Sequence, residues 1–506
     1  MRHQTMLNLK NASWGSVEYV IVAILQLIAI PVIVKGIGVQ MYGVWVISNT
    51  FLGLSGILSL GMGQTTLKYV SKYRALQNMD YVSRIICATL TVYLFISFIS
   101  AVVLFFASRP LIQHVFTVTP ENMQVAVDVL RITSLGLVFY FANMSFDAAI
   151  RGFERFDFAV SAKLFIMIGM QAGRIGLILA GFGIRSVIWF TVCMFICEAG
   201  LKIWILRRHF LPGFKPVPLL EMQIIREIFS FGLFTWFNTM ILLLRTNLEP
   251  MILGALLGTE ALTYYFIAKG LVDQVLNLIG KTFAFVFPAT SKLFEMKDAR
   301  EIIGREFNRF SFVALSIGVF IIAPMAYLSY PLLEIWIGKD IAVQTYTILK
   351  FMCIAYAFQP LGVINGNYLY ALGEVKLMTM INALSTVVIL SAMVWGASVW
   401  GMEGAVKALC LTIIFVFLNR LLVESKIFEH WQMSKLLRLM VATLLPVITA
   451  VYLPYKMLLG SNLISILLWG SVIGFCSVGA LVIIVGEYRS TVYYLNRLIR
   501  CKWNEV

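Results

Sequence analysis

Long apolar runs separated by short polar stretches follow one another along the whole chain. A run of about 20 apolar residues is long enough to cross a bilayer as an α-helix. The pattern therefore predicts an all-α polytopic membrane protein with about fourteen transmembrane helices and no soluble domain. The predicted spans are residues 13–35, 41–62, 84–107, 126–149, 160–182, 185–206, 228–249, 251–280, 308–329, 344–370, 377–398, 402–424, 436–457 and 463–486.

The basic residues between these spans indicate an orientation. If successive spans alternate in direction, 26 Lys and Arg residues fall on one side of the membrane. Loops rich in Lys and Arg remain in the cytoplasm, so this side is predicted to be cytoplasmic, together with both termini. A wrong span count would scramble the alternation, so the unequal split supports fourteen. The five basic residues on the other side are Lys35, Arg109, Arg185, Lys339 and Lys456.

The chain also repeats itself at an offset of 219–220 residues, which aligns Gly38 with Gly258 and Trp45 with Tyr265. Six spans per repeat is an even number, so both repeats cross the membrane in the same direction. Their symmetry axis should then run along the membrane normal, with a site between the halves near the midplane. The predicted parts are an N-terminal six-helix half over residues 1–211, a C-terminal six-helix half over residues 212–430, and two additional helices with a cytoplasmic tail over residues 431–506.

The composition agrees with a membrane protein. Of the 506 residues, 60% are hydrophobic and 13% are charged, whereas soluble domains contain about 25% charged residues. The net charge of +15 reflects the basic flanks of the spans, which meet anionic lipid headgroups, and does not indicate nucleic acid. Most of the seven cysteines lie in apolar runs and are typical of small hydrophobes rather than of disulfides. No cofactor or metal motif and no cleavable signal peptide is found.

Charged residues within the apolar stretch from Phe231 to Lys281 are the first candidates for function. Each charge at a bilayer centre costs about 2.5–3.5 kcal/mol unless it faces a partner or a water-filled cavity. Lys269, Asp273 and Lys281 recur at multiples of four residues, so they share a slowly drifting helical face. The pattern predicts a hydrophilic, partly cationic path. The structural alternative is two i, i+4 ion pairs, Arg245–Glu249 and Lys269–Asp273.

Several short motifs, spread over the first twelve spans, carry a family resemblance. The chain resembles the O-antigen-type oligosaccharide flippases of bacterial polysaccharide synthesis, within the superfamily that also contains multidrug exporters and the lipid II flippase. The motifs allow tight turns and close helix contacts and name no substrate. They are Ile30-Pro31-Val32-Ile33-Val34-Lys35-Gly36-Ile37-Gly38, Tyr42-Gly43-Val44-Trp45, Leu60-Gly61-Met62-Gly63, Leu332-Leu333-Glu334-Ile335-Trp336-Ile337-Gly338, Ala371-Leu372-Gly373-Glu374 and Trp400-Gly401-Met402-Glu403-Gly404-Ala405.

This resemblance implies a transporter and not an enzyme. Its substrate would be an undecaprenyl-pyrophosphate-linked oligosaccharide, such as an O-antigen repeat unit, moved from the cytoplasmic to the periplasmic leaflet of the bacterial inner membrane. The resemblance also implies alternating access coupled to an H⁺ or Na⁺ gradient. The partners it suggests are membrane lipid, a glycan polymerase and chain-length proteins.

Within that function, cationic side chains would bind the pyrophosphate and aromatic rings would stack on sugars. Arg174 is notable because it lies deep in an apolar run with no acidic residue within eight positions. The predicted substrate-binding residues are Arg245, Lys269, Arg174, Lys281, Trp236, Tyr264, Tyr265 and Asn238. The predicted ion-coupling residues are Asp273, Glu249 and Glu18.

Two other functions are weighed against the flippase. A drug or metabolite cation antiporter of the same superfamily would favour acidic residues in its cavity, whereas bases outnumber acids among the candidates here. A membrane-embedded glycan polymerase or transferase would need catalytic residues at the interface. The longest predicted outer loops, near residues 109–125 and 330–343, offer few such groups.

Overall fold

The computed structural model describes residues 21–59, 61–294, 300–428, 433–452 and 463–485. These residues are almost entirely helical, and no β-strand occurs among them. Residue contacts divide the chain into a first unit, Met1–Thr263, and a second unit, Tyr264–Val506. This division follows packing, whereas the predicted boundary after residue 211 follows the sequence repeat and stays a prediction.

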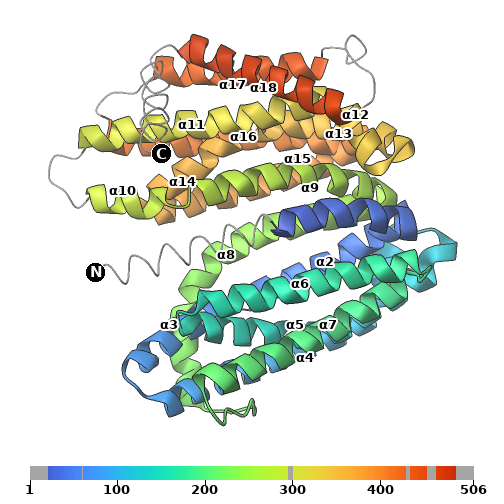
Figure 1. Ribbon diagram of the computed structural model, residues 1–506, viewed down its shortest axis with the longest axis vertical. Helices are drawn as coiled ribbons and strands as arrows, with labels where there is room; N and C mark the ends of the chain where they lie inside the picture. Colours follow the sequence, from blue (N-terminus) through green and yellow to red (C-terminus); the bar gives the residue numbers. More distant parts are fainter. Residues whose placement is uncertain (1–20, 60, 295–299, 429–432, 453–462, 486–506) are drawn as a thin grey trace. The chain divides into compact units, whose positions relative to one another are not determined.

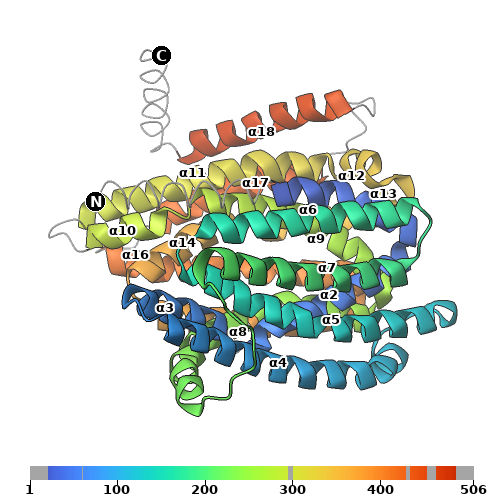
Figure 2. The same ribbon diagram turned by 60° about the horizontal axis from the view of Figure 1, so that its bottom comes forward.

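The first unit is built from antiparallel helices joined by short connections (Figures 1 and 2). The long helices α4, α5 and α7 pack side by side, and α8 packs against α2, α3 and α4. The helices are Ile21–Ile37, α2 (Val39–Leu58), α3 (Met62–Ala75), α4 (Met79–Pro110), α5 (Pro120–Gly152), α6 (Phe156–Leu179), α7 (Ile184–Ile205) and α8 (Met222–Leu256). Single π-helical turns, Leu111–Val115 and Leu206–Phe210, extend α4 and α7.

The second unit has the same kind of construction. Helix α9 (Gly258–Thr282) begins just before the division and continues into this unit. The other helices are α10 (Val286–Phe294), α11 (Arg300–Tyr327), α12 (Ser329–Ile337), α13 (Lys339–Tyr356), α14 (Gln359–Ala371), α15 (Val375–Ala408), α16 (Thr412–Ile427), α17 (Met433–Tyr452) and α18 (Leu463–Val485). A 3₁₀ turn, Leu409–Leu411, joins α15 to α16.

Nine helical segments in the described ranges are long and apolar enough to cross a membrane. One of them, Val375–Ile427, has 53 residues and is long enough for two spans. It breaks at Gly401, whose φ of 62° and ψ of −145° are not helical. Every one of the fourteen predicted ranges coincides with helix among the described residues. The all-α polytopic membrane fold is therefore confirmed, and fourteen spans are consistent with it.

Large apolar side chains on the outside of the helices agree with a lipid environment. On α4, Phe95, Phe98 and Phe106 are 66%, 65% and 75% exposed. In water, this much apolar surface on one helix would favour aggregation, whereas lipid solvates it. We conclude that the chain is a multi-pass membrane protein.

Backbone features recur at the offset that the sequence predicts. Gly38, just before α2, and Gly258, the first residue of α9, are 220 positions apart and have positive φ angles of 85° and 87°. Gly181 and Gly401 are also 220 positions apart and have φ of 83° and 62°. Glycine adopts this left-handed region without the steric cost that a Cβ atom brings. Two positions with positive φ therefore recur at the spacing of the predicted repeat, which itself stays a prediction.

A side-chain contact also recurs, once inside each unit. Asn143 of α5 donates its Nδ2 to the carbonyl oxygen of Phe195 in α7, at 2.8 Å. Asn365 of α14 donates its Nδ2 to the carbonyl oxygen of Val416 in α16, at 3.0 Å. Both asparagines are buried, and they are 222 positions apart. In the first unit, the hydrogen bond joins the helices of the predicted fourth and sixth spans. In the second unit, it joins those of the tenth and twelfth.

Candidate functional site

The two charges of α8 lie in contact. Arg245 Nε is 3.6 Å from Glu249 Oε1, and the two side chains are 22% and 1% exposed. One of the two i, i+4 ion pairs considered from the sequence therefore forms. A carboxylate this deeply buried needs a nearby cation, so Arg245 has a structural role whatever else it binds.

Helix α8 is held closely against α2 near this pair. A Cβ atom at Gly53 would come within 2.2 Å of the Asn247 Oδ1, and one at Gly56 within 2.8 Å of Leu243. Trp236 donates its indole N–H to the carbonyl oxygen of Ile57. The indole of Trp236 is therefore fixed by the backbone of α2. The side chain of Asn238 and the whole of Glu18 lie outside the part of the structure that is described.

The stripe on α9 runs from buried to exposed positions. Lys269 is only 9% exposed, and its Nζ lies 5.8 Å from the centre of the Tyr265 ring. Tyr265 is fully buried, so its ring packs against Lys269 and has no exposed face for a sugar. Tyr264 and Asp273 are partly buried, and Lys281 is exposed. The predicted drift of the stripe around the helix accounts for this change.

Arg174 of α6 is buried among uncharged groups. Its Nε and Nη2 donate to Thr191 Oγ1 of α7, at 3.2 and 3.1 Å, and its Nη1 donates to Gln171 Oε1 at 3.2 Å. The guanidinium also lies 5.3 Å from the Trp45 ring centre, a cation–π distance. Among the described residues, no carboxylate pairs with this arginine, which is 8% exposed. Its described contacts are therefore all with uncharged groups.

A small cavity adjoins Thr191. Its volume is about 10 Å³, which is close to the space that one water needs. Its lining is mostly apolar, with four polar side chains from α2, α5 and α7, and two of these, Ser48 and Thr133, hydrogen-bond to each other at 2.6 Å. The described residues that line it carry no charge.

The sequence analysis missed a second cluster of charges, in α5 and α7, in which Lys202 is buried and the other three side chains are partly exposed. Lys202 Nζ lies 2.7 Å from Glu198 Oε1 and 3.8 Å from Asp147 Oδ1. Arg151 Nε contacts the other oxygen of Asp147 at 2.6 Å. Glu198 and Lys202 have i, i+4 spacing, a signal that could have found them, but they lie near the end of a predicted span.

The second unit has a related cluster on α16. Arg420 pairs with Glu424 at 2.8 Å, and the two side chains are 5% and 3% exposed. Arg420 also donates to Ser311 Oγ at 2.8 Å and to Asn308 Oδ1 at 3.0 Å. These positions lie 222 residues after Glu198 and Lys202, with the order of the charges reversed.

Comparison with known proteins identifies the family. A family model described as a polysaccharide biosynthesis protein matches residues 37–342. The chain belongs to this family. It is also 20% identical over 422 residues to a Shigella flexneri protein described as a "Putative O-antigen transporter", across 80% of this chain and 95% of that relative.

Two solved structures share the fold of this polysaccharide biosynthesis protein. The lipid II flippase MurJ, in an inward closed conformation, matches with a TM-score of 0.70 at 13% identity, over 94% of this chain and 99% of its own. An inward-facing MATE family multidrug resistance transporter of the MOP superfamily matches with a TM-score of 0.64 at 14% identity, over 80% and 94%. At such identities the likeness shows the fold alone.

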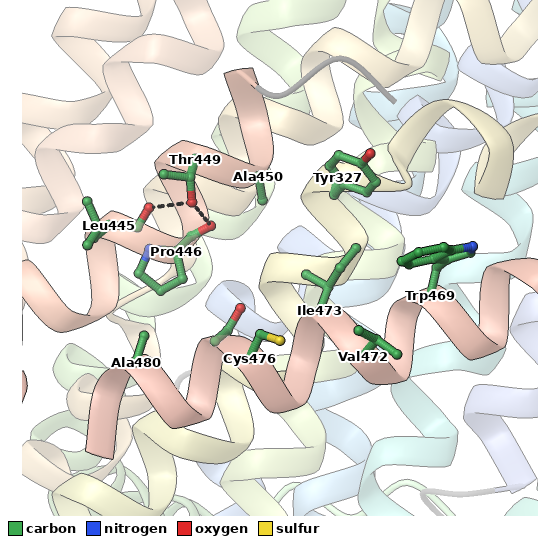
Figure 3. Close-up of a pocket in the computed structure, with 11 residues that line it drawn as sticks. Tyr327, Leu445, Pro446, Thr449, Ala450, Trp469, Val472, Ile473, Cys476 and Ala480 are labelled. Carbon is green, nitrogen blue, oxygen red and sulfur yellow. Dashed lines mark hydrogen bonds between the residues drawn. The ribbon is translucent and has the colours of Figure 1, made fainter. Parts of the chain in front are cut away.

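An apolar groove lies on the second unit between α17, α18 and α11 (Figure 3). Its volume is about 370 Å³. Pro446 and Ala450 of α17, Val472 and Ile473 of α18, and Tyr327 of α11 point into it. The Thr449 hydroxyl donates to carbonyl oxygens of its own helix. Trp469 and Ser477 also line the groove, whose lining is otherwise mostly apolar.

Proposed function

We propose that this family member flips an undecaprenyl-pyrophosphate-linked oligosaccharide, an O-antigen or similar surface-glycan repeat unit, across the bacterial inner membrane. Movement runs from the cytoplasmic to the periplasmic leaflet by alternating access, with both termini in the cytoplasm. Membership of the polysaccharide biosynthesis family and the likeness to an O-antigen transporter support this proposal. Glycan polymerase and chain-length proteins are its expected partners in the membrane.

The burial of Arg174 among neutral groups is the observation that carries the substrate class. A buried charge is costly unless it is paired, and threonine, glutamine and an indole ring only partly replace water. A pyrophosphate supplies the missing negative charge and fits the planar fork of a guanidinium. A cation antiporter would gain nothing from such a group.

The other predicted residues take complementary roles in this proposal. Arg245, Lys269 and Lys281 supply further positive charge for the pyrophosphate. Trp236 and Tyr264 supply rings for sugar faces, and Tyr265 acts by packing against Lys269. The undecaprenyl chain is accommodated by apolar surface, for which the groove between α17 and α18 is suited.

Coupling to H⁺ or Na⁺ is assigned to Asp273, Glu249 and Glu18. Of these, Glu249 is paired with Arg245, so a pyrophosphate at Arg245 would compete with Glu249 for the guanidinium, and a coupling cation would compete with Arg245 for the carboxylate. This exchange would link the substrate to the ion within a single helix.

The test replaces Arg174 in cells that lack the wild-type protein. Arg174→Gln should lower surface glycan at least about tenfold, equivalent to about 1.4 kcal/mol, with membrane abundance near wild type. Arg174→Lys keeps the charge without the fork and should retain partial activity. Arg185→Gln, which breaks an ion pair with Asp128 between half-exposed side chains, is the matched control and should keep surface glycan.

Different results reject different parts of the proposal. Wild-type surface glycan in Arg174→Gln would remove Arg174 from the substrate site. Unchanged surface glycan in cells without the protein, and no accumulation of lipid-linked repeat units on the cytoplasmic side, would reject the function itself.

A further inference from the structure

Lys202 is held by oxygen atoms from two helices, like a bound metal cation. Its Nζ lies 2.7 Å from Glu198 Oε1 on its own helix α7. From α5 it is approached by the Asn143 backbone carbonyl oxygen at 3.3 Å and by Asp147 Oδ1 at 3.8 Å. The Lys202 side chain is only 4% exposed. Carboxylate and carbonyl oxygens are also the ligands that hard metal cations prefer.

The charges of this cluster balance only while Lys202 is present. Arg151 contacts Asp147 at 2.6 Å, so two bases face two acids. Removal of the ammonium would leave one excess negative charge among partly exposed carboxylates, where charge is screened less than in water.

Two buried side-chain oxygen atoms of α5 have no hydrogen-bond partner. Asn143 is 4% exposed, its Nδ2 is used by the Phe195 carbonyl, and its Oδ1 is buried without a hydrogen bond. Ser145 Oγ on the same helix is likewise buried without a partner. Buried acceptors without a donor are uncommon and indicate a place for a cation or a water.

We infer that the Lys202 ammonium is a tethered cation, which occupies an oxygen site that a free Na⁺ would otherwise fill. The first unit therefore carries its own positive charge between α5 and α7, helices that lie side by side in Figure 1. A chain with this lysine does not respond to Na⁺ at this place. A chain without it gains a Na⁺ site.

A plain structural ion pair makes a different prediction. If Lys202 only ties α7 to α5, its loss weakens the protein equally in every monovalent salt, apart from general screening. If it replaces a cation, a small cation restores stability and a large organic cation does not.

The experiment measures the thermal unfolding midpoint of the purified full-length protein in Na⁺ and in choline, each at about 0.2 M chloride so that screening is equal. Lys202→Ala should unfold at a lower temperature than wild type, and Na⁺ should raise its midpoint by at least about 2 °C over choline. Any Na⁺ that binds at the proposed coupling residues raises the midpoint of every variant, so wild type supplies the reference difference between the two salts, and Lys202→Ala should exceed it by at least about 2 °C. Lys202→Met, which fills the space with an apolar side chain, should not exceed it.

Two controls localise the effect. Lys202→Ala combined with Glu198→Gln removes a ligand and should abolish the Na⁺ response. Lys407→Ala removes the lysine of an exposed i, i+4 pair with Glu403 and should respond to Na⁺ no more than wild type. If Lys202→Ala cannot be purified, Lys202→Ser receives the same titration. A Na⁺ response of Lys202→Ala and Lys202→Ser no larger than that of wild type would overturn the inference.

Discussion

Arg245 has a structural partner and a proposed substrate, and a double-mutant cycle separates the two roles. Glu249 is 1% exposed and lies 3.6 Å from the guanidinium. At that distance, two unit charges attract by about 4–5 kcal/mol at an effective dielectric constant of about 20. Desolvation offsets part of this attraction, so removal of Arg245 alone should destabilise the protein by about 3 kcal/mol.

The cycle compares wild type, Arg245→Ala, Glu249→Ala and the double variant, with membrane abundance and surface glycan as readouts. Arg245→Ala should lower abundance because a buried carboxylate loses its cation. The double variant should recover abundance, because neither charge is left alone. If Arg245 binds pyrophosphate, the double variant should still lack surface glycan, and Arg245→Lys should retain part of it. Full surface glycan in the double variant would refute substrate binding by Arg245.

Two further predictions follow from the described geometry. Arg420→Met should lower the free energy of unfolding by about 3–5 kcal/mol, whereas Arg420→Met combined with Glu424→Leu should be closer to wild type, because neither charge is then buried without the other. Thermal unfolding of wild type and the two variants measures these differences. A double variant less stable than Arg420→Met alone would contradict the coupling between the two residues. A cysteine in place of Arg109 should react with a membrane-impermeant reagent added to intact cells, and protection of that cysteine until the inner membrane is broken would contradict the proposed orientation.

The spans were predictable because hydropathy acts locally along the chain, but the breaks within them depend on packing. Residues 344–370 read as one apolar run, yet the structure divides them into α13 and α14. Pro360 lies in the first turn of α14, where a backbone N–H has no partner within the helix, so the missing N–H of proline costs nothing there. Pro360 therefore explains the break between the two helices once the boundary is known. Gly401 has a non-helical backbone conformation, as expected for a glycine in a motif that allows tight turns.

The candidate site was only partly predictable, for a physical reason. Arg174 could be identified from the sequence because its apolar neighbours belong to its own helix. Its hydrogen-bond partner Thr191 could not, because Thr191 belongs to α7. The buried position of Lys202 depends on Asp147, 55 positions earlier in the chain. Periodicity identifies a face of a helix but does not identify the helix that covers it.

The reversed charge order in the two units has a consequence for the ancestry of this chain. If the halves descend from one duplicated segment, the pairs Glu198–Lys202 and Arg420–Glu424 began as the same pair. A single substitution on the way from one order to the other would have placed two acids or two bases together in a buried place. The lineage must then have passed through a pair without charge, or changed both positions together. Descendants should therefore carry opposite charges at these two positions, or none.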